Sequence, residues 1–205
     1  MIDFEFIRDN WLFIATGIGA TLGVTIFSFL FATPIAAIVA RGRRSSFLPI
    51  KALSTFYVLL IDGIPLLLQI FFIFLALPQL GIIFPGLAAS LLVMTVNYSA
   101  RMSEIFYARL VVTEESQGET WTSIIPSFAN EFASMIKDST LLSVTGFIHD
   151  VMWRATKVGR AEFKMLEALT IAIIIYLILI TIVTLGGKFL KMILSTAKSG
   201  KESSI

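Results

Sequence analysis

The chain has 205 residues, of which 57% are hydrophobic and 15% are charged, and its formal net charge is +2. Soluble domains are typically about 45–50% apolar and about 25% charged, so the composition predicts one integral membrane domain and no separate soluble one. The absence of Cys excludes disulfides and thiolate metal sites, and a single His argues against a zinc site. The small net charge gives no indication of nucleic-acid binding, so no nucleic-acid partner is expected.

The sequence also lacks the residue patterns of catalysis. It contains no nucleophile–base constellation, no glycine-rich phosphate loop and no paired-carboxylate spacing. We therefore expect no enzymatic activity and no cofactor. If ATP drives this protein, another chain binds it.

The first eleven residues predict an interfacial helix that leads into the membrane. They contain three carboxylates and one Arg among aromatic residues, whereas a signal peptide begins with a basic region. The run 12–40 is free of charge and predicts the first spanning helix. Within it, Gly17, Gly19 and Gly23 indicate close packing against another helix.

Two further apolar segments follow a short basic loop that contains Arg41, Arg43, Arg44 and Lys51. The segments 53–76 and 87–108 predict the second and third spanning helices, with a turn rich in Pro and Gly between them. Near the end of the third, Asn97, Arg101 and Glu104 share one helical face by their i, i+4, i+7 spacing. Arg101 and Glu104 either pair only with each other or belong to a polar lining.

The segment 124–146 predicts the fourth spanning helix and contains the main polar stripe of the chain, with Asn130, Glu131, Ser134, Lys137 and Asp138. A charge at the centre of a membrane helix costs about 2.5–3.5 kcal/mol on insertion scales. Such a stripe must therefore face protein or water. It is either a buried ion pair that holds a helix bundle together or the lining of a path for a polar substance.

The last part of the chain predicts an amphipathic external segment at 147–167, a fifth spanning helix at 168–190 and a basic tail. Five spans place the two termini on opposite sides of the membrane. The loops 41–51 and 109–123 and the tail hold more Lys and Arg than the other side. The positive-inside rule then places the N-terminus outside and the C-terminus in the cytoplasm.

Three segments, Asp62–Gln69, Ser103–Phe106 and the stretch from Asn130 to Gly146, resemble motifs of the membrane permease subunits of ABC importers for polar amino acids. Asp62–Gln69 is similar to the family's RGTPLLVQ segment, and Ser103–Phe106 to the start of its AEIFRGG motif. Asn130–Phe132 and Lys137–Gly146 are similar to its NQF and KDTSLxSVIG motifs. The resemblance runs over nearly the whole chain.

The resemblance implies a fold, a function and a set of partners. The fold is that of an all-α integral membrane protein of the permease type, in the bacterial cytoplasmic (inner) membrane, and it works by alternating access. A periplasmic or lipid-anchored substrate-binding protein delivers an amino acid, two permease subunits form the path through the lipid bilayer, and separate ABC ATPase subunits drive the change of state.

The polar stripe and the resemblance together suggest roles for particular residues. We expect the substrate path to include Asp138, Asn130, Glu131, Ser134, Asn97 and Gln69. We expect a structural ion pair among Lys137, Glu104 and Arg101, in which Lys137 pairs with Glu104 and leaves Asp138 free to meet a cationic group of the substrate.

The sequence departs from the family in the loop that contacts the ATPase. The end of the family's EAA motif is present as Ile124-Ile125-Pro126, but the Glu-Ala-Ala start and its helix are not, and the segment 109–123 is short and acidic. We expect only a weak ATPase contact, through Glu119, Ile124, Ile125 and Pro126. Asp62, where the family has Arg, is a second departure.

The short loop leaves three interpretations open. The chain could be a working permease whose hetero-dimer partner provides the main ATPase contact, and this favours a hetero-dimer over a homo-dimer. It could be a degenerate or accessory subunit without ATPase coupling. It could also be a small channel.

Overall fold

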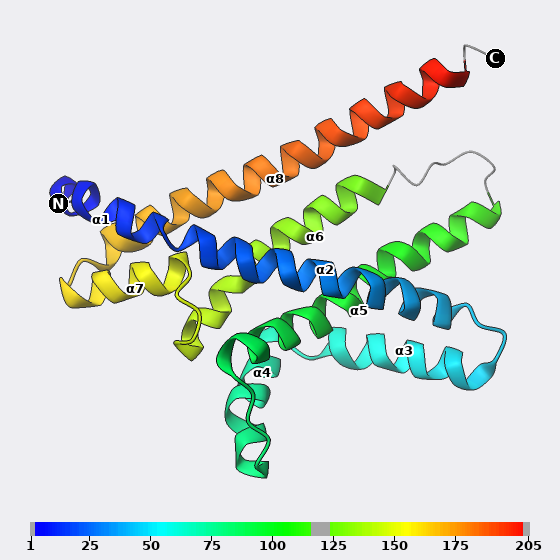
Figure 1. Ribbon diagram of the computed structural model, residues 1–205, viewed down its shortest axis with the longest axis horizontal. Helices are drawn as coiled ribbons and strands as arrows, with labels where there is room; N and C mark the ends of the chain where they lie inside the picture. The colour runs from blue at the N-terminus through cyan, green and yellow to red at the C-terminus, as the bar shows by residue number, and fades with distance from the viewer. Residues whose placement is uncertain (1–2, 116–123, 203–205) are drawn as a thin grey trace.

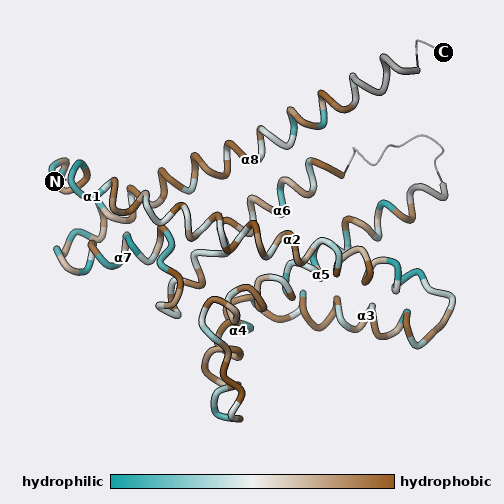
Figure 2. Tube along the Cα trace, in the orientation of Figure 1, coloured by the Kyte–Doolittle hydropathy of each residue, from teal (hydrophilic) through white to brown (hydrophobic). Residues whose placement is uncertain are grey.

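The computed structural model describes residues 3–115 and 124–202, and every regular element in these ranges is a helix. Most helices run along one long axis (Figure 1). Helices α1 (Phe4–Ala15) and α7 (Val151–Ala161) lie at one end, and α8 (Met165–Glu202) runs from there to the other end. Polar residues gather at α1 and α7, while apolar residues dominate the long helices between the two ends (Figure 2). The all-α prediction is therefore confirmed for the described residues.

The core is built where α2 (Ile18–Arg43) packs along α5 (Gly86–Glu115). The buried residues of α2 are almost all small: Thr21, Val24, Thr25, Ser28, Ala32, Ala36 and Ala40. Because these side chains are small, the two helix backbones can approach closely. Larger side chains of α5, among them Met94, Tyr98 and Met102, complete this cluster.

The close packing predicted for the glycines of the first helix occurs only at Gly17. A Cβ atom at Gly17 would lie 2.5 Å from the backbone nitrogen of Val151, so only glycine fits there. At Gly19 and Gly23 an added Cβ would meet nothing within 4 Å, and the prediction is wrong for these two positions.

Helices α1, α7 and α8 form a second cluster at the α1 end of the molecule. Phe6, Val151, Ala155 and Ile171 are buried in it. Asp150 caps the N-terminus of α7 by accepting a hydrogen bond from the backbone N–H of Trp153 at 2.8 Å. Burial raises the pKa of this carboxyl to about 6, although its hydrogen bonds act in the opposite direction.

The prediction of one continuous helix over 53–76 is wrong. The chain forms α3 (Leu48–Gly63), then turns by 97° into α4 (Leu66–Phe71), which continues as the π-helical Phe72–Ala76 and the 3₁₀-helical Leu77–Leu80. The cause is Pro65, which has no N–H and keeps the preceding Ile64 out of the helical conformation, at φ −103° and ψ 125°.

The prediction of one α-helix over 124–146 is also wrong. Helix α6 (Ile125–Asp138) ends after 14 residues, and Ser139–Thr145 follow as a 3₁₀-helix. Four hydroxyl groups there donate to carbonyls three residues back, which favours the tighter helix; they belong to Ser139, Thr140, Ser143 and Thr145. Gly146, with φ 74°, ends the segment.

The other predicted helices exist with shifted bounds. The range 12–40 corresponds to the end of α1 and most of α2, 87–108 to α5, and 168–190 to part of α8. By length and apolarity, two stretches of the described chain can each cross a membrane, Phe4–Arg43 and Met165–Leu194. The bent pair of α3 with Leu66–Leu80 is a third if it counts as one span. The number of five spans therefore stays a prediction.

Candidate functional site

The polar stripe of α6 faces α5, where both carboxylates meet one guanidinium. Nη2 of Arg101 lies 3.2 Å from Oε2 of Glu131, and Nη1 lies 3.6 Å from Oδ2 of Asp138. Glu131 and Asp138 are seven residues apart, two turns of α6, so both project from the same face. We call Arg101, Glu131 and Asp138 the charged triad.

A buried tyrosine supports the triad from α5. The hydroxyl of Tyr98 donates a hydrogen bond of 2.7 Å to Oδ2 of Asp138. Tyr98 itself has no exposed surface. The guanidinium of Arg101 lies 4.8 Å from the centre of the Tyr98 ring, a distance suited to a cation–π contact. Sequence reasoning did not single out Tyr98. Its spacing of i, i+3 to Arg101 was the available signal, since such residues neighbour each other on a helix.

The triad is accessible and has an excess of negative charge. Its side chains are 32%, 22% and 33% exposed for Arg101, Glu131 and Asp138. Oε2 of Glu131 is in ion-pair contact with Arg101 but accepts no hydrogen bond from the described part of the chain. Glu131 and Asp138 share the single guanidinium of Arg101. The site therefore offers a cation and two incompletely neutralised anions to an incoming polar molecule.

The other residues expected along the path are distributed around the triad. Asn97 is one helical turn before Arg101 on α5 and is 4% exposed, and its Oδ1 accepts no hydrogen bond from the described residues. On α6, Ser134 is half-buried and Asn130 is exposed. Asn97 is therefore the member of this group with an unused buried acceptor.

Gln69 stabilises the bend between α3 and α4. Its side-chain Nε2 donates to the carbonyls of Ile61 at 2.8 Å and Ile64 at 2.9 Å. These carbonyls are left without helical partners by the break at Pro65. The residue also borders an almost wholly apolar cavity of about 600 Å³ between α3 and α4.

The ion pair predicted between Lys137 and Glu104 is wrong. Glu104 instead accepts a hydrogen bond of 2.7 Å from Nη1 of Arg43, which reaches it from the end of α2 and also lies over the Tyr107 ring. Lys137 is exposed. Asp138 is not free as predicted, since Arg101 and Tyr98 both contact it. Residues 137 and 138 point about 100° apart on the helix, so only one of them can face α5.

The predicted ATPase contact is described only in part. Glu119 lies outside the described residues. Ile124 and Ile125 border an apolar cavity of about 590 Å³ together with Phe106 and Phe128, and Pro126 occupies the first turn of α6. Proline is well suited to that position because its missing N–H would have no helical partner there.

Comparison with known proteins finds similarity to transporter subunits over most of the chain. No protein-family model matches the sequence. The chain is 28% identical over 208 residues to the arginine transport system permease protein ArtQ of Bacillus subtilis, covering 91% of this chain and 94% of that protein. It is 28% identical over 172 residues to the L-cystine transport system permease protein TcyB of the same organism, covering 74% and 73%.

A third relative and a solved structure agree with these two. The probable glutamine ABC transporter permease protein GlnM of Bacillus subtilis is 25% identical over 203 residues, covering 89% of this chain and 94% of that protein. A chain of a crystal structure of an amino acid ABC transporter with histidines has the same fold. Its TM-score is 0.84 with 24% identity, over 94% of this chain and 99% of that chain.

Proposed function

We propose that this chain, which is homologous to the permease subunits of amino-acid ABC transporters, forms the membrane path of a polar amino acid. The homology confirms the resemblance drawn from the sequence motifs. The observation that supports the transport role most directly is the charged triad, because it places one cation and two anions, between 22% and 33% exposed, on two facing helices that we propose as membrane crossings.

The triad can exchange its internal contacts for contacts with a zwitterion. The guanidinium of Arg101 can bind an α-carboxylate, and the carboxylates of Glu131 and Asp138 can bind an ammonium or guanidinium group. Each new contact replaces an existing one, so every charge of the triad keeps a partner while the amino acid passes. The buried acceptor of Asn97 and the hydroxyl of Ser134 would provide further contacts in the same path.

We further propose five membrane crossings in the bacterial cytoplasmic (inner) membrane, by α2, α3 with α4, α5, α6 with its 3₁₀ extension, and α8. The end with α1 and α7 faces outside, and the basic turn after α2 faces the cytoplasm. Transport then requires a separate ABC ATPase, a second permease subunit and a soluble or lipid-anchored binding protein. The chain itself hydrolyses no ATP.

The second permease subunit that we propose is a different chain and not a second copy. The support is the short acidic segment before Ile124, whose sequence lacks the Glu-Ala-Ala start of the family's EAA motif. A degenerate subunit without ATPase coupling is the competing function. A complex that binds the amino acid but does not hydrolyse ATP when the substrate is supplied would favour it.

The proposed function is tested by uptake. The complex purified through a tag on this chain, reconstituted in proteoliposomes with its binding protein added outside, should accumulate a polar amino acid only when ATP is enclosed with the ATPase. A panel of radiolabelled cationic, neutral and acidic amino acids identifies the substrate. Equal accumulation with ATP and with a non-hydrolysable analogue would contradict an ATP-driven importer and favour a channel.

The proposed topology predicts which positions a membrane-impermeant thiol reagent can reach. Because the chain has no native Cys, single Cys variants at Ser45, Thr156 and Ser199 report without background. In intact cells we expect labelling of Thr156→Cys alone, and in inverted vesicles labelling of Ser45→Cys and Ser199→Cys. Labelling of positions 156 and 199 from the same side would contradict five crossings.

A further inference from the structure

At the corner between α7 and α8, the exposed aromatic residue Phe163 has an unfavourable backbone conformation. Phe163 has φ 57° and is, among the described residues, the one non-glycine with a positive φ. The residue is 94% exposed. The left-handed conformation is disfavoured for every residue with a Cβ, and for a bulky one it is a true outlier.

The turn explains the conformation but not the choice of residue. The backbone N–H of Lys164 donates to the carbonyl of Gly159 at 2.9 Å, which is the bond that closes a Schellman motif at the end of α7. Phe163 occupies the position that glycine usually fills in this motif. With the side chain almost fully exposed, no packing within the described chain compensates the cost. A strained and exposed residue of this kind indicates a role outside the chain.

Charged residues surround this corner in two separate groups. Helix α7 contributes Arg154, Lys157 and Arg160 and has no carboxylate between Val151 and Ala161. Lys157 and Arg160 border a cleft of about 540 Å³ with Trp153, and the ammonium of Lys157 lies 4.8 Å from the Trp153 ring centre.

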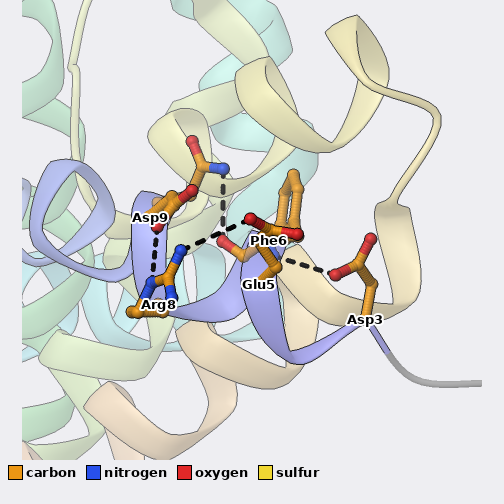
Figure 3. A network of polar contacts seen from close by, with 6 residues as sticks. Asp3, Glu5, Phe6, Arg8 and Asp9 are labelled. Atoms are coloured by element: carbon orange, nitrogen blue, oxygen red, sulfur yellow. Dashed lines mark hydrogen bonds and ion pairs between the residues drawn. The ribbon is translucent and has the colours of Figure 1, made fainter.

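The neighbouring helix α1 presents mainly the opposite sign. Glu5 and Asp9 lie on either side of Arg8, at 3.5 Å and 2.9 Å, and all three side chains are more than half exposed (Figure 3). Asp3 caps α1 and accepts a hydrogen bond of 2.9 Å from Nζ of Lys164, next to Phe163. This contact links the corner between α7 and α8 to α1.

We propose that Phe163 is the anchor of a protein-docking surface, oriented by the basic face of α7 and the acidic residues of α1. This surface fits a soluble partner with an apolar pocket for the ring and an acidic patch opposite Lys157 and Arg160. Resting on the proposed function, we assign the partner as the amino-acid-binding protein. An apolar anchor inside a charged rim is the arrangement of an interaction hot spot.

The mixed charge favours a protein over the membrane surface as the occupant. Anionic headgroups would attract α7, but they would repel Glu5 and Asp9 on α1 and Glu162 beside Phe163 in the chain, all of which are exposed. Insertion of Phe163 into the bilayer would also draw Glu162, its neighbour in the chain, towards the hydrocarbon. A partner with patches of both signs satisfies both helices.

Substitution by glycine separates a docking role from a structural one. The probe is the soluble binding protein, taken as the protein from the same host that stimulates ATP hydrolysis by the tagged, reconstituted complex. For Phe163→Gly we expect an unchanged or higher thermal unfolding midpoint, because the backbone strain is relieved. The half-stimulating concentration of the binding protein should nevertheless rise about tenfold, the effect of losing a modest hot spot, at an unchanged maximal rate.

Two variants serve as controls. Phe163→Trp keeps a large ring and should retain most of the stimulation at wild-type concentrations. Phe189→Ala removes an aromatic side chain that is 59% exposed on α8, far along the helix from the corner, and should leave the curve unchanged. An unchanged curve for Phe163→Gly would overturn the proposal.

Charge reversal tests the orientation. For the wild type, the half-stimulating concentration should increase with added salt, because complementary charges mainly set the association rate. In the double variant Lys157→Glu with Arg160→Glu, this concentration should be higher, and it should no longer increase with added salt. If the effect of these variants follows instead the fraction of anionic lipid in the vesicles, the occupant is lipid and the proposal is wrong. Both results leave ATP-driven uptake itself intact, so they are distinct from a failure of the proposed function.

Discussion

Arg101→Met should lower the stability of the folded protein by about 2 kcal/mol and abolish transport. The substitution keeps the length of the side chain but leaves Glu131 and Asp138 without the cation that contacts both. Removing one partner of a fully buried ion pair costs about 3–5 kcal/mol, and the one-third exposure of the triad reduces this figure. The thermal unfolding midpoint of the purified protein in one detergent, followed by tryptophan fluorescence, measures the loss.

Two further variants show whether the loss comes from the triad. Arg101→Met combined with Glu131→Gln should recover most of the stability, because only one carboxylate then remains, but it should not recover transport. Arg41→Met removes an exposed arginine at the end of α2 and should unfold at the wild-type temperature. If Arg101→Met also unfolds at that temperature, the triad does not stabilise the fold.

The presence of most helices could be predicted from the sequence, because an apolar run without charges has few alternatives to a membrane helix. The runs that became α2 and α8 are of this kind. The bend between α3 and α4 could have been predicted from Pro65, since the residue before proline avoids the helical conformation. Its angle could not, because the break is stabilised by the side chain of Gln69, which reaches back across it.

The candidate site was predictable as two polar faces but not as a set of contacts. Helical spacing places Asn97, Arg101 and Glu104 on one face of α5, and Glu131 and Asp138 on one face of α6. The sequence does not fix how far each helix is rotated or which level of one helix meets which level of the other. In the structure, Arg101 forms ion pairs with both carboxylates of α6. Glu104 forms an ion pair with Arg43, which lies at the end of α2.

Asp138→Asn should reduce transport of a cationic amino acid while the protein stays folded and inserted. Asparagine has nearly the shape of aspartate, and its side-chain oxygen can still accept the hydrogen bond that Tyr98 donates at 2.7 Å. Arg101 then faces one carboxylate, Glu131, so the triad becomes neutral and the fold keeps its ion pair. A charged hydrogen bond is worth about 1.5–3 kcal/mol, so loss of the bond to a substrate cation should lower kcat/KM about tenfold or more.

The reference in this experiment is a neutral amino acid. If Asp138 binds the cationic side chain, the ratio of arginine or lysine uptake to glutamine uptake should fall in Asp138→Asn and recover in part in Asp138→Glu. Tyr98→Phe removes the hydrogen bond to Asp138 but keeps the carboxylate, so it should change this ratio less. An unchanged ratio in Asp138→Asn would refute the substrate role. A protein that fails to fold would assign Asp138 to the structure of the bundle, because the charge itself would then be what holds α6 against Arg101.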